Sequence, residues 1–335
     1  LGDVYKRQSS RCRPKTRRLP TRLTAARNSR LPLLTSICGE QQVNCSMKFR
    51  TEYPAMADSE FRLDYQKPLV LLGSCFADNI GQRLINTGWQ ASVNPCGVLY
   101  NPLSIADTLQ AAIDGNFVPE THLHPGSGLT FSFSFSTKFS RPDAAQAIDV
   151  MKEGMAQLRN GLLTAQALIV TFGTSWVFRL KETGKVVANC HKLPADCFVR
   201  RCCSLQEMLE MWQGLLSRLK ALNPDMKVIF TVSPVRHLAD GFTGNMRSKA
   251  RLLLLCEELA QLPQCLYFPA YEILNDDLRD YRFYADDLVH LSAMAADYIF
   301  NKFTDTFVPP STLPLMTDAL KSYRRSLHRP INPVN

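Results

Sequence analysis

The segment "LVLLGSCFADNIG", residues 69–81, carries the pattern that decides the fold. Its first part is a continuous apolar run that ends at a glycine, which is typical of a strand buried on both faces. After it, Phe76, Ile80 and Leu84 recur every four residues, the spacing of the apolar face of a helix. The segment therefore predicts a buried strand followed directly by a helix, with Ser74 at their junction.

The same alternation of strand and helix repeats downstream. Further strand-like runs lie at 167–173, 227–234 and 265–271, and the helical stretches before them lie at 143–160, 204–221 and 246–261. Strands separated by helices imply right-handed crossovers and a parallel sheet covered on both faces. We therefore predict an α/β fold, a single domain with a mostly parallel sheet of about five strands flanked by helices. Two more strands are expected outside this pattern, at 129–139 and 184–190.

The formal charge of the chain is +9, and it is concentrated at the beginning of the sequence. Residues 1–46 hold ten Lys and Arg against two acidic residues, whereas the rest of the chain holds 29 basic and 28 acidic residues. Nucleic-acid binding depends on an excess of positive charge, which this main part lacks. We therefore predict no nucleic-acid partner.

The first 46 residues show no sustained apolar periodicity. Residues 4–8, "VYKRQ", look like a translated sequencing adapter, so we expect residues 1–46 to be a non-native or disordered leader and the protein itself to start at Met47. A basic nucleic-acid arm and a targeting peptide are the alternatives. The apolar run at 31–37 is short and broken by proline, which fits an export signal poorly.

No window of the sequence reaches the ~18 consecutive apolar residues of a membrane span. Eight of the eleven cysteines lie beyond the leader, scattered rather than spaced as a disulfide framework, so we expect reduced thiols and a cytoplasmic protein. The stretch "CHKLPADCFVRRCC", residues 190–203, lacks the Cys-x-x-Cys pair of a zinc site. We therefore expect no metal.

Ser74 lies where ligands bind in open parallel sheets, beyond the carboxyl end of a strand. The free N–H groups and dipole of the following helix can stabilise an oxyanion there. Capping of the helix is the alternative role for Ser74, because serine is a favoured N-cap. Cys75 is the alternative nucleophile, since a thiol near a helix N-terminus has a lowered pKa. The two side chains differ by about 100° around the helix, so both cannot face one imidazole.

A second pattern near the other end of the chain adds the parts of a proton relay. In "YADDLVHLSAMAADYIF", residues 284–300, Asp287 precedes His290 by three residues. This spacing lets a carboxylate reach Nδ1 of the imidazole and leaves Nε2 to accept a proton from a serine. Asp286 is adjacent, so the choice of Asp287 depends on that spacing. A surface or capping histidine is the alternative for His290.

Six blocks of the sequence together resemble the GSCFA-domain family, which is itself similar to the SGNH, or GDSL-like, hydrolases. They are "GSCFA" (73–77), "NPCGVLYNPLSI" (94–105), "TFGTSWVF" (171–178), "NCHKLP" (189–194), "SPVRHLADGFTGNMRSKA" (233–250) and "YRFYADDLVH" (281–290). The resemblance spans roughly residues 48–306 and implies a three-layer α/β/α fold, so we expect one domain over residues 47–307. The prolines at 308–335 indicate a Pro-containing tail. The resemblance also implies a Ser-His-Asp site with Ser74 as nucleophile, His290 as general base and Asp287 as its orienting acid.

The sequence departs from the wider hydrolase pattern at the oxyanion site. Where those enzymes have Gly-x-Asn-Asp, this chain has Gly-Thr-Ser-Trp at 173–176, so the usual asparagine is missing. The backbone N–H groups of Ser74 and Gly97 are the expected donors. The side-chain donor stays open among Asn101, Thr174 and Asn189.

Three further side chains are expected to face the same cleft and to bind substrate: His191, Arg236 and His237. Arg236 and His237 follow a strand end, and they can hold a carboxylate, a phosphate or a sugar hydroxyl. Pairing of Arg236 with a nearby acid is the alternative.

These observations predict a hydrolase or acyltransferase that acts on O-acyl esters of a small molecule or glycan, without a metal or organic cofactor. The competing interpretation is a non-catalytic protein of the same fold that binds a glycan or an acylated ligand. The missing asparagine favours it, whereas the retained serine and Asp-x-x-His pair favour catalysis. The acyl group, its carrier and the oligomeric state stay open.

Overall fold

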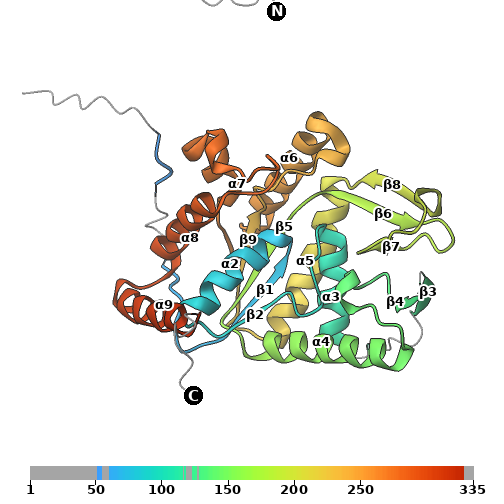
Figure 1. Ribbon diagram of the computed structural model, residues 1–335, viewed down its shortest axis with the longest axis horizontal. Helices are drawn as coiled ribbons and strands as arrows, with labels where there is room; N and C mark the ends of the chain where they lie inside the picture. Colours follow the sequence, from blue (N-terminus) through green and yellow to red (C-terminus); the bar gives the residue numbers. More distant parts are fainter. Residues whose placement is uncertain (1–50, 55–59, 116, 118–122, 127, 328–335) are drawn as a thin grey trace, which may run out of the picture. The chain divides into compact units, whose positions relative to one another are not determined.

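A computed structural model describes residues 51–54, 60–115, 117, 123–126 and 128–327. Its centre is a five-stranded parallel sheet with the strand order β10-β9-β5-β1-β2 (Figure 1). The strands are β1 (Leu69–Gly73), β2 (Ala91–Val93), β5 (Ala167–Phe172), β9 (Lys227–Val232) and β10 (Cys265–Tyr267). The predicted α/β fold with a mostly parallel sheet of about five strands is therefore confirmed.

Helices cover both faces of this sheet, because successive residues of each strand point to opposite sides. Val70 and Leu72 belong to the core beneath α3 (Pro102–Asp114), α4 (Ala144–Thr164), α5 (Leu205–Leu222) and α6 (Gly241–Leu259). Leu69 and Leu71 pack with α2 (Cys75–Asn86) and α8 (Ala293–Phe307) on the other face. The result is the three-layer α/β/α arrangement that the family resemblance implies (Figure 1).

Short helical segments complete the described chain. They are η2 (Thr137–Phe139), η3 (Ala195–Cys197), η4 (Leu238–Asp240), α7 (Ala270–Glu272), the π-helical η5 (Ile273–Leu278), η6 (Tyr281–Phe283), η7 (Pro310–Thr312) and α9 (Leu313–Leu327). The last two form most of the described part of the expected tail. No helix in the described ranges combines the length and apolar character that a membrane crossing requires. The expected leader at 1–46 lies outside the described residues.

The order of the strands identifies the edge at which a site can form. From β1 the chain moves to β2 on one side of it and later to β5 on the other side. The loops after β1 and β5 therefore diverge, which opens a crevice at their carboxyl ends, the usual ligand position in open α/β sheets. Ser74 lies directly after β1, and Gly173 directly after β5.

Two small antiparallel sheets lie outside the main sheet. One pairs β3 (His124–Gly126) with β4 (Leu129–Phe131), and the other has the order β7-β6-β8, with β6 (Trp176–Leu180), β7 (Val186–Val187) and β8 (Phe198–Cys202). The strand expected over 129–139 was wrong beyond Phe131, because a turn in which Phe135 N–H donates to Ser132 O interrupts it. Of the strand expected at 184–190, only the two residues of β7 form, and they pair with β6.

Candidate active site

The carboxyl ends of the central strands are tied together by one buried lysine. Lys249, in α6, donates from Nζ to the carbonyl oxygens of Gly173 and Ser233, at 2.6 Å in each case. These residues follow β5 and β9. Burial lowers the pKa of Lys249 to about 7. The lysine therefore fixes the spacing of the two loops that flank the crevice.

Gly73 sets the sharp turn that places Ser74 at the start of α2. Its φ is +134°, and a Cβ added there would lie 2.1 Å from the carbonyl oxygen of Thr171, so only glycine fits. Ser74 then caps the helix, since its Oγ accepts a hydrogen bond from Phe76 N–H at 3.3 Å. The residue is fully buried. The capping role considered from the sequence is therefore present in the structure.

The two backbone donors expected for an oxyanion are already engaged. The N–H of Ser74 donates to Thr171 O at 3.2 Å, and the N–H of Gly97 donates to Asn94 O at 2.8 Å. The next amide along the chain differs, because the Cys75 N–H donates to no backbone carbonyl in the described ranges. The first amide of α2 without a backbone acceptor is therefore that of Cys75.

The thiol of Cys75 lies in surroundings that oppose its ionisation. Burial raises its pKa, and the nearby carboxylate of Asp78 adds to the effect, while Lys249 and backbone amides act in the opposite direction. A cysteine nucleophile requires the thiolate. This environment therefore disfavours Cys75 as the attacking group.

The Asp-x-x-His pattern forms a compact loop, which we call the DDLVH loop (residues 286–290). The carboxylate of Asp287 accepts the N–H groups of Val289 and His290 on Oδ1, both at 2.9 Å, and its Oδ2 lies 2.7 Å from His290 Nδ1. The hydrogen bond from the His290 ring and those from the two amides lower the pKa of Asp287 to about 2. No described residue bonds His290 Nε2, so that nitrogen is free to accept a proton.

The backbone of the DDLVH loop is strained and closed on itself. Leu288 has a φ of +56°, in the left-handed region that a branched side chain rarely adopts. Hydrogen bonds from Ala285 N–H to His290 O and from Leu288 N–H to Ala285 O hold this shape, at 2.8 and 2.9 Å. Such strain persists only where the surrounding structure imposes it, and it concentrates at functional sites.

A second loop, the SPVRH loop (residues 233–237), connects the DDLVH loop to the sheet. The Arg236 N–H donates to Val289 O at 3.3 Å. The Arg236 guanidinium donates to the hydroxyl of Tyr284 at 2.9 Å and lies over its ring. Arg236 therefore joins the two loops, and it pairs with a tyrosine rather than with an acid.

His237, the last residue of the SPVRH loop, comes close to Ser74. Its Nε2 lies 3.2 Å from the point that a Cβ on Gly173 would occupy, and the Cβ of Ser74 lies 3.3 Å from the same point. The distance between His237 Nε2 and Ser74 Cβ therefore cannot exceed the sum of these two distances. His237 Nε2 is buried, and it has no hydrogen-bond partner in the part of the chain that the structure describes.

The structure brings Asp287 and His290 into contact but does not join them to Ser74. Within the described ranges no hydrogen bond links Ser74 Oγ to His290. The side chain of His290 is 54% exposed, whereas Ser74 is fully buried. The electrostatic influence of His290 nevertheless reaches His237, which lies beside Ser74.

Two of the open side-chain donors are engaged in local structure at the edge of the crevice. Asn101 caps α3, accepting Ser104 N–H on Oδ1 at 2.8 Å and donating from Nδ2 to Ser104 Oγ at 3.0 Å. The Thr174 hydroxyl lies 3.1 Å from Ser248 Oγ and accepts the N–H of Trp176 at 3.1 Å.

The third open donor, Asn189, and the substrate-binding candidate His191 lie in the region of the small sheets. Asn189 Oδ1 accepts the N–H of His191 at 2.8 Å. His191 Nε2 lies 2.9 Å from Ser132 O and 3.1 Å from Phe135 O. Its ring stacks on Phe131, with centroids 4.1 Å apart. These contacts tie the loop after β7 to the segment after β4.

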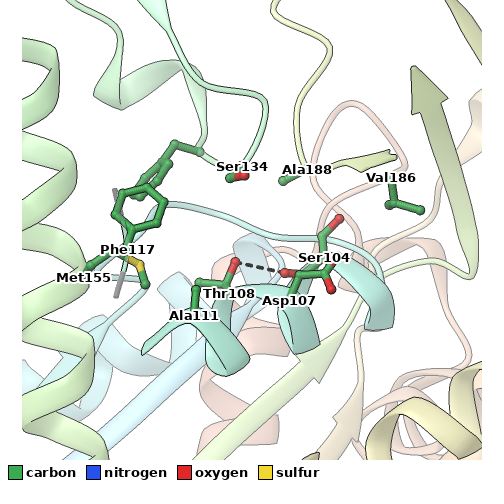
Figure 2. A pocket seen from close by; sticks show the side chains of 10 residues that line it. Ser104, Asp107, Thr108, Ala111, Phe117, Ser134, Met155, Val186 and Ala188 are labelled. Carbon is green, nitrogen blue, oxygen red and sulfur yellow. Dashed lines mark hydrogen bonds between the residues drawn. The ribbon is translucent and has the colours of Figure 1, made fainter. Parts of the chain in front are cut away.

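A small cavity beside α3 is separate from this edge. Its volume is about 60 Å³, and Figure 2 shows it between the helix, with Asp107 and Thr108, and two further segments, one with Ser134 and the other with Val186 and Ala188. Burial raises the pKa of Asp107, but none of the residues predicted for the site lines the cavity. That volume holds a few waters rather than an ester substrate.

Sequence reasoning missed Lys249 and the amide of Cys75. Lys249 lies among apolar positions of α6, in register with the buried Asn245 and Leu252, and this placement was the available signal. A lysine on the buried face of a helix requires acceptors in the interior. No sequence pattern marks the Cys75 amide, because its availability depends on which neighbouring N–H groups donate hydrogen bonds to the strands of the sheet.

Comparison with known proteins identifies the family. The model of the GSCFA family matches residues 68–303. The chain belongs to the GSCFA family. A search of curated proteins finds no match.

Solved structures of similar fold are distant. One is provisionally described as a platelet activating factor from Streptococcus pneumonia, with 12% identity, 72% of this chain and 85% of that chain covered, and a TM-score of 0.38. Two are family 3 carbohydrate esterases. The enzyme of Talaromyces cellulolyticus is 12% identical, the match covers 76% of this chain and 99% of that one, and the TM-score is 0.30. The enzyme of Clostridium thermocellum is 10% identical, the match covers 75% of this chain and 98% of that one, and the TM-score is 0.31.

Proposed function

We propose that this GSCFA protein is a serine hydrolase that acts on O-acyl esters, with Ser74 as nucleophile and His290 as general base. The observation that carries the proposal is the Asp287–His290 pair. Its carboxylate is fixed by two amides and by the imidazole Nδ1, and the imidazole Nε2 is free, on a loop bonded to the SPVRH loop. This is the arrangement that a serine requires of its proton acceptor.

The reaction follows from these roles. Ser74 Oγ attacks the ester carbonyl, a C–O bond forms, and the hydroxyl proton passes to His290 Nε2. His290 then returns the proton to the leaving alcohol as the old C–O bond breaks. Water repeats the sequence on the acyl-enzyme and releases the acid, whereas a second alcohol in place of water gives an acyltransferase. Asp287 holds the imidazole tautomer and stabilises the imidazolium between the two steps.

The hydroxyl of Ser74 remains available for this role although it caps a helix. Its oxygen accepts the Phe76 N–H, which leaves its own hydrogen free to be donated. Catalytic hydrogen bonds are often long without substrate and tighten when substrate binds. We expect the substrate to displace the groups that bury Ser74 and to bring the DDLVH loop toward it.

Labelling of the full-length chain with a fluorophosphonate, read by intact-mass spectrometry, tests the proposal. We expect one adduct on the wild type and on Cys75→Ala, and none on Ser74→Ala or His290→Ala. An adduct that survives Ser74→Ala contradicts the assigned nucleophile. An adduct that disappears only in Cys75→Ala would assign the reaction to the thiol instead.

A binding protein of the same fold is the second candidate. The burial of Ser74, and the lack of a hydrogen bond from it to His290 within the described residues, favour this candidate. It predicts that the folded wild type forms no fluorophosphonate adduct at any reagent concentration that leaves its melting temperature unchanged.

A further inference from the structure

His237 has a buried ring nitrogen that the proposed triad does not use. Nε2 is inaccessible to solvent and has no hydrogen-bond partner in the described chain. Burying such a group without a partner costs about 1–3 kcal/mol, so a fold keeps it only where packing or function requires it. The His237 backbone is anchored to α6, since its N–H donates to Asn245 Oδ1 at 3.0 Å.

The unused nitrogen faces the space next to the nucleophile. Gly173 is what keeps that space open, because a Cβ there would lie 3.0 Å from Tyr100 O, 3.2 Å from His237 Nε2 and 3.3 Å from Ser74 Cβ. The ring of Tyr100 packs edge-on against the His237 ring, with centroids 5.6 Å apart. His237 Nε2 and Ser74 Cβ therefore border the same small space above Gly173.

The surroundings of His237 keep its imidazole uncharged. Burial lowers its pKa to about 4, and the positive charges of Lys249, His290 and Arg200 contribute in the same direction. A neutral imidazole carries one N–H, and it can donate that hydrogen without gaining a charge. It is poorly suited to accept a proton from Ser74, because the resulting imidazolium would lie beside these cations.

We propose that the neutral imidazole of His237 donates a hydrogen bond from Nε2 to the oxyanion that forms when Ser74 attacks an ester carbonyl, together with the Cys75 N–H. The inference rests on the proposed hydrolase function and supplies the side-chain donor that the missing asparagine of Gly-x-Asn-Asp leaves open. In the step, the electron pair of the carbonyl π bond moves to its oxygen, and the Ser74 proton moves to His290. His237 keeps its own proton throughout.

Three substitutions at His237 test this role in the full-length chain, with 4-nitrophenyl acetate as the probe. The amide nitrogen of a glutamine reaches the position of Nε2, whereas that of an asparagine overlaps Nδ1 and stops short of it. We expect His237→Leu to lower kcat about 10²- to 10³-fold with KM nearly unchanged, as removal of an oxyanion donor does. His237→Gln should recover about tenfold or more of that loss, and His237→Asn should not.

The pH dependence of kcat separates this role from a structural or a proton-accepting one. We expect the acidic limb to stay in place in His237→Gln, because His290 still accepts the proton. Equal losses in the Gln and Leu variants, a loss confined to KM, or a displaced acidic limb would overturn the role of His237. A wild type that neither hydrolyses the ester nor reacts with fluorophosphonate overturns the hydrolase proposal and this inference with it. A reactive wild type matched by His237→Leu overturns this inference alone.

Discussion

The DDLVH and SPVRH loops each present a histidine near the carboxyl edge of the sheet, and their surroundings differ. The side chain of His290 is about half exposed and lies 2.7 Å from the Asp287 carboxylate. His237 has a buried Nε2 without a hydrogen-bond partner in the described ranges, and burial first and Lys249 second lower its pKa. One imidazole is therefore paired with a negative charge, and the other is shielded from water beside positive ones.

This difference assigns roles to chemically identical side chains. An imidazole next to a carboxylate can take up a proton in the transition state, because the carboxylate stabilises the charge that forms. An imidazole in a buried, positively charged environment stays neutral, and its remaining N–H can donate a hydrogen bond without the ring gaining a charge. Pairs of titratable groups whose environments push their behaviour apart are typical of active sites.

Removal of His290 should have the largest effect. We expect His290→Ala to lower kcat for 4-nitrophenyl acetate about 10⁴-fold, well beyond the loss in His237→Leu, because the variant lacks the imidazole assigned to accept the Ser74 proton. Steady-state kinetics on the purified full-length chain measures both losses. As a control, His124→Gln changes a histidine of β3 and should stay within about twofold of wild type. If His237→Leu costs more than His290→Ala, the two roles are reversed.

Loss of the charge on Asp287 should follow in size. We expect Asp287→Asn to lower kcat about 10³-fold, because an amide can neither hold the required tautomer nor stabilise the imidazolium. The pKa of Asp287 is about 2, so the carboxylate is ionised and the loss should be the same across neutral pH. Asp286→Asn is the matched control, since it removes the neighbouring carboxylate. Equal losses in the two variants would contradict the assignment from spacing.

Much of the fold was predictable because its signals are local. The run at 69–73 and the apolar face of α2 follow one another within 20 residues, and β5, β9 and their preceding helices repeat the pattern. β2 is only three residues long and leaves no periodicity to detect. The alternation at 129–139 indicated a strand, but the turn at Ser132 cut it short, which a hydrophobic pattern alone does not reveal.

The candidate site likewise combines local contacts, which the sequence predicts, with long-range contacts, which it does not. The contact between Asp287 and His290 depends on a spacing of three residues, so the sequence predicts it. The approach of His237 to Ser74 depends on the absence of a side chain at Gly173, in a third loop, and no spacing records that. The engagement of the Ser74 amide by Thr171 likewise follows from strand pairing across nearly a hundred residues.

Filling the space between the two side chains should have a smaller effect than removing either. Gly173→Ala puts a methyl group within 3.0 to 3.3 Å of Tyr100 O, His237 Nε2 and Ser74 Cβ, so these neighbours must shift slightly. We expect kcat to fall about tenfold, because small displacements of a catalytic group are costly. Gly214→Ala is the control, since nothing lies within 4 Å of the added Cβ in α5. Equal kinetics in both variants would place His237 and Ser74 farther apart in solution.

The last prediction concerns stability rather than rate, and it tests the neutrality of His237 without any substrate. The pKa is about 4 in the folded protein and 6.5 for an ordinary histidine, so between these values the unfolded chain binds one more proton. The contribution of His237 to the free energy of unfolding therefore increases between pH 4 and about pH 6.5 and is complete above that range. It is lost as the pH falls toward 4. His237→Gln cannot titrate at this position, so its stability relative to wild type should be more favourable at pH 4.5 than at pH 7, by about 2 kcal/mol.

Urea unfolding at the two pH values measures this difference. If the stabilities of the two proteins change in parallel with pH, the folded state does not keep His237 neutral. In that case the contrast between the two loops would no longer distinguish a donor from a base.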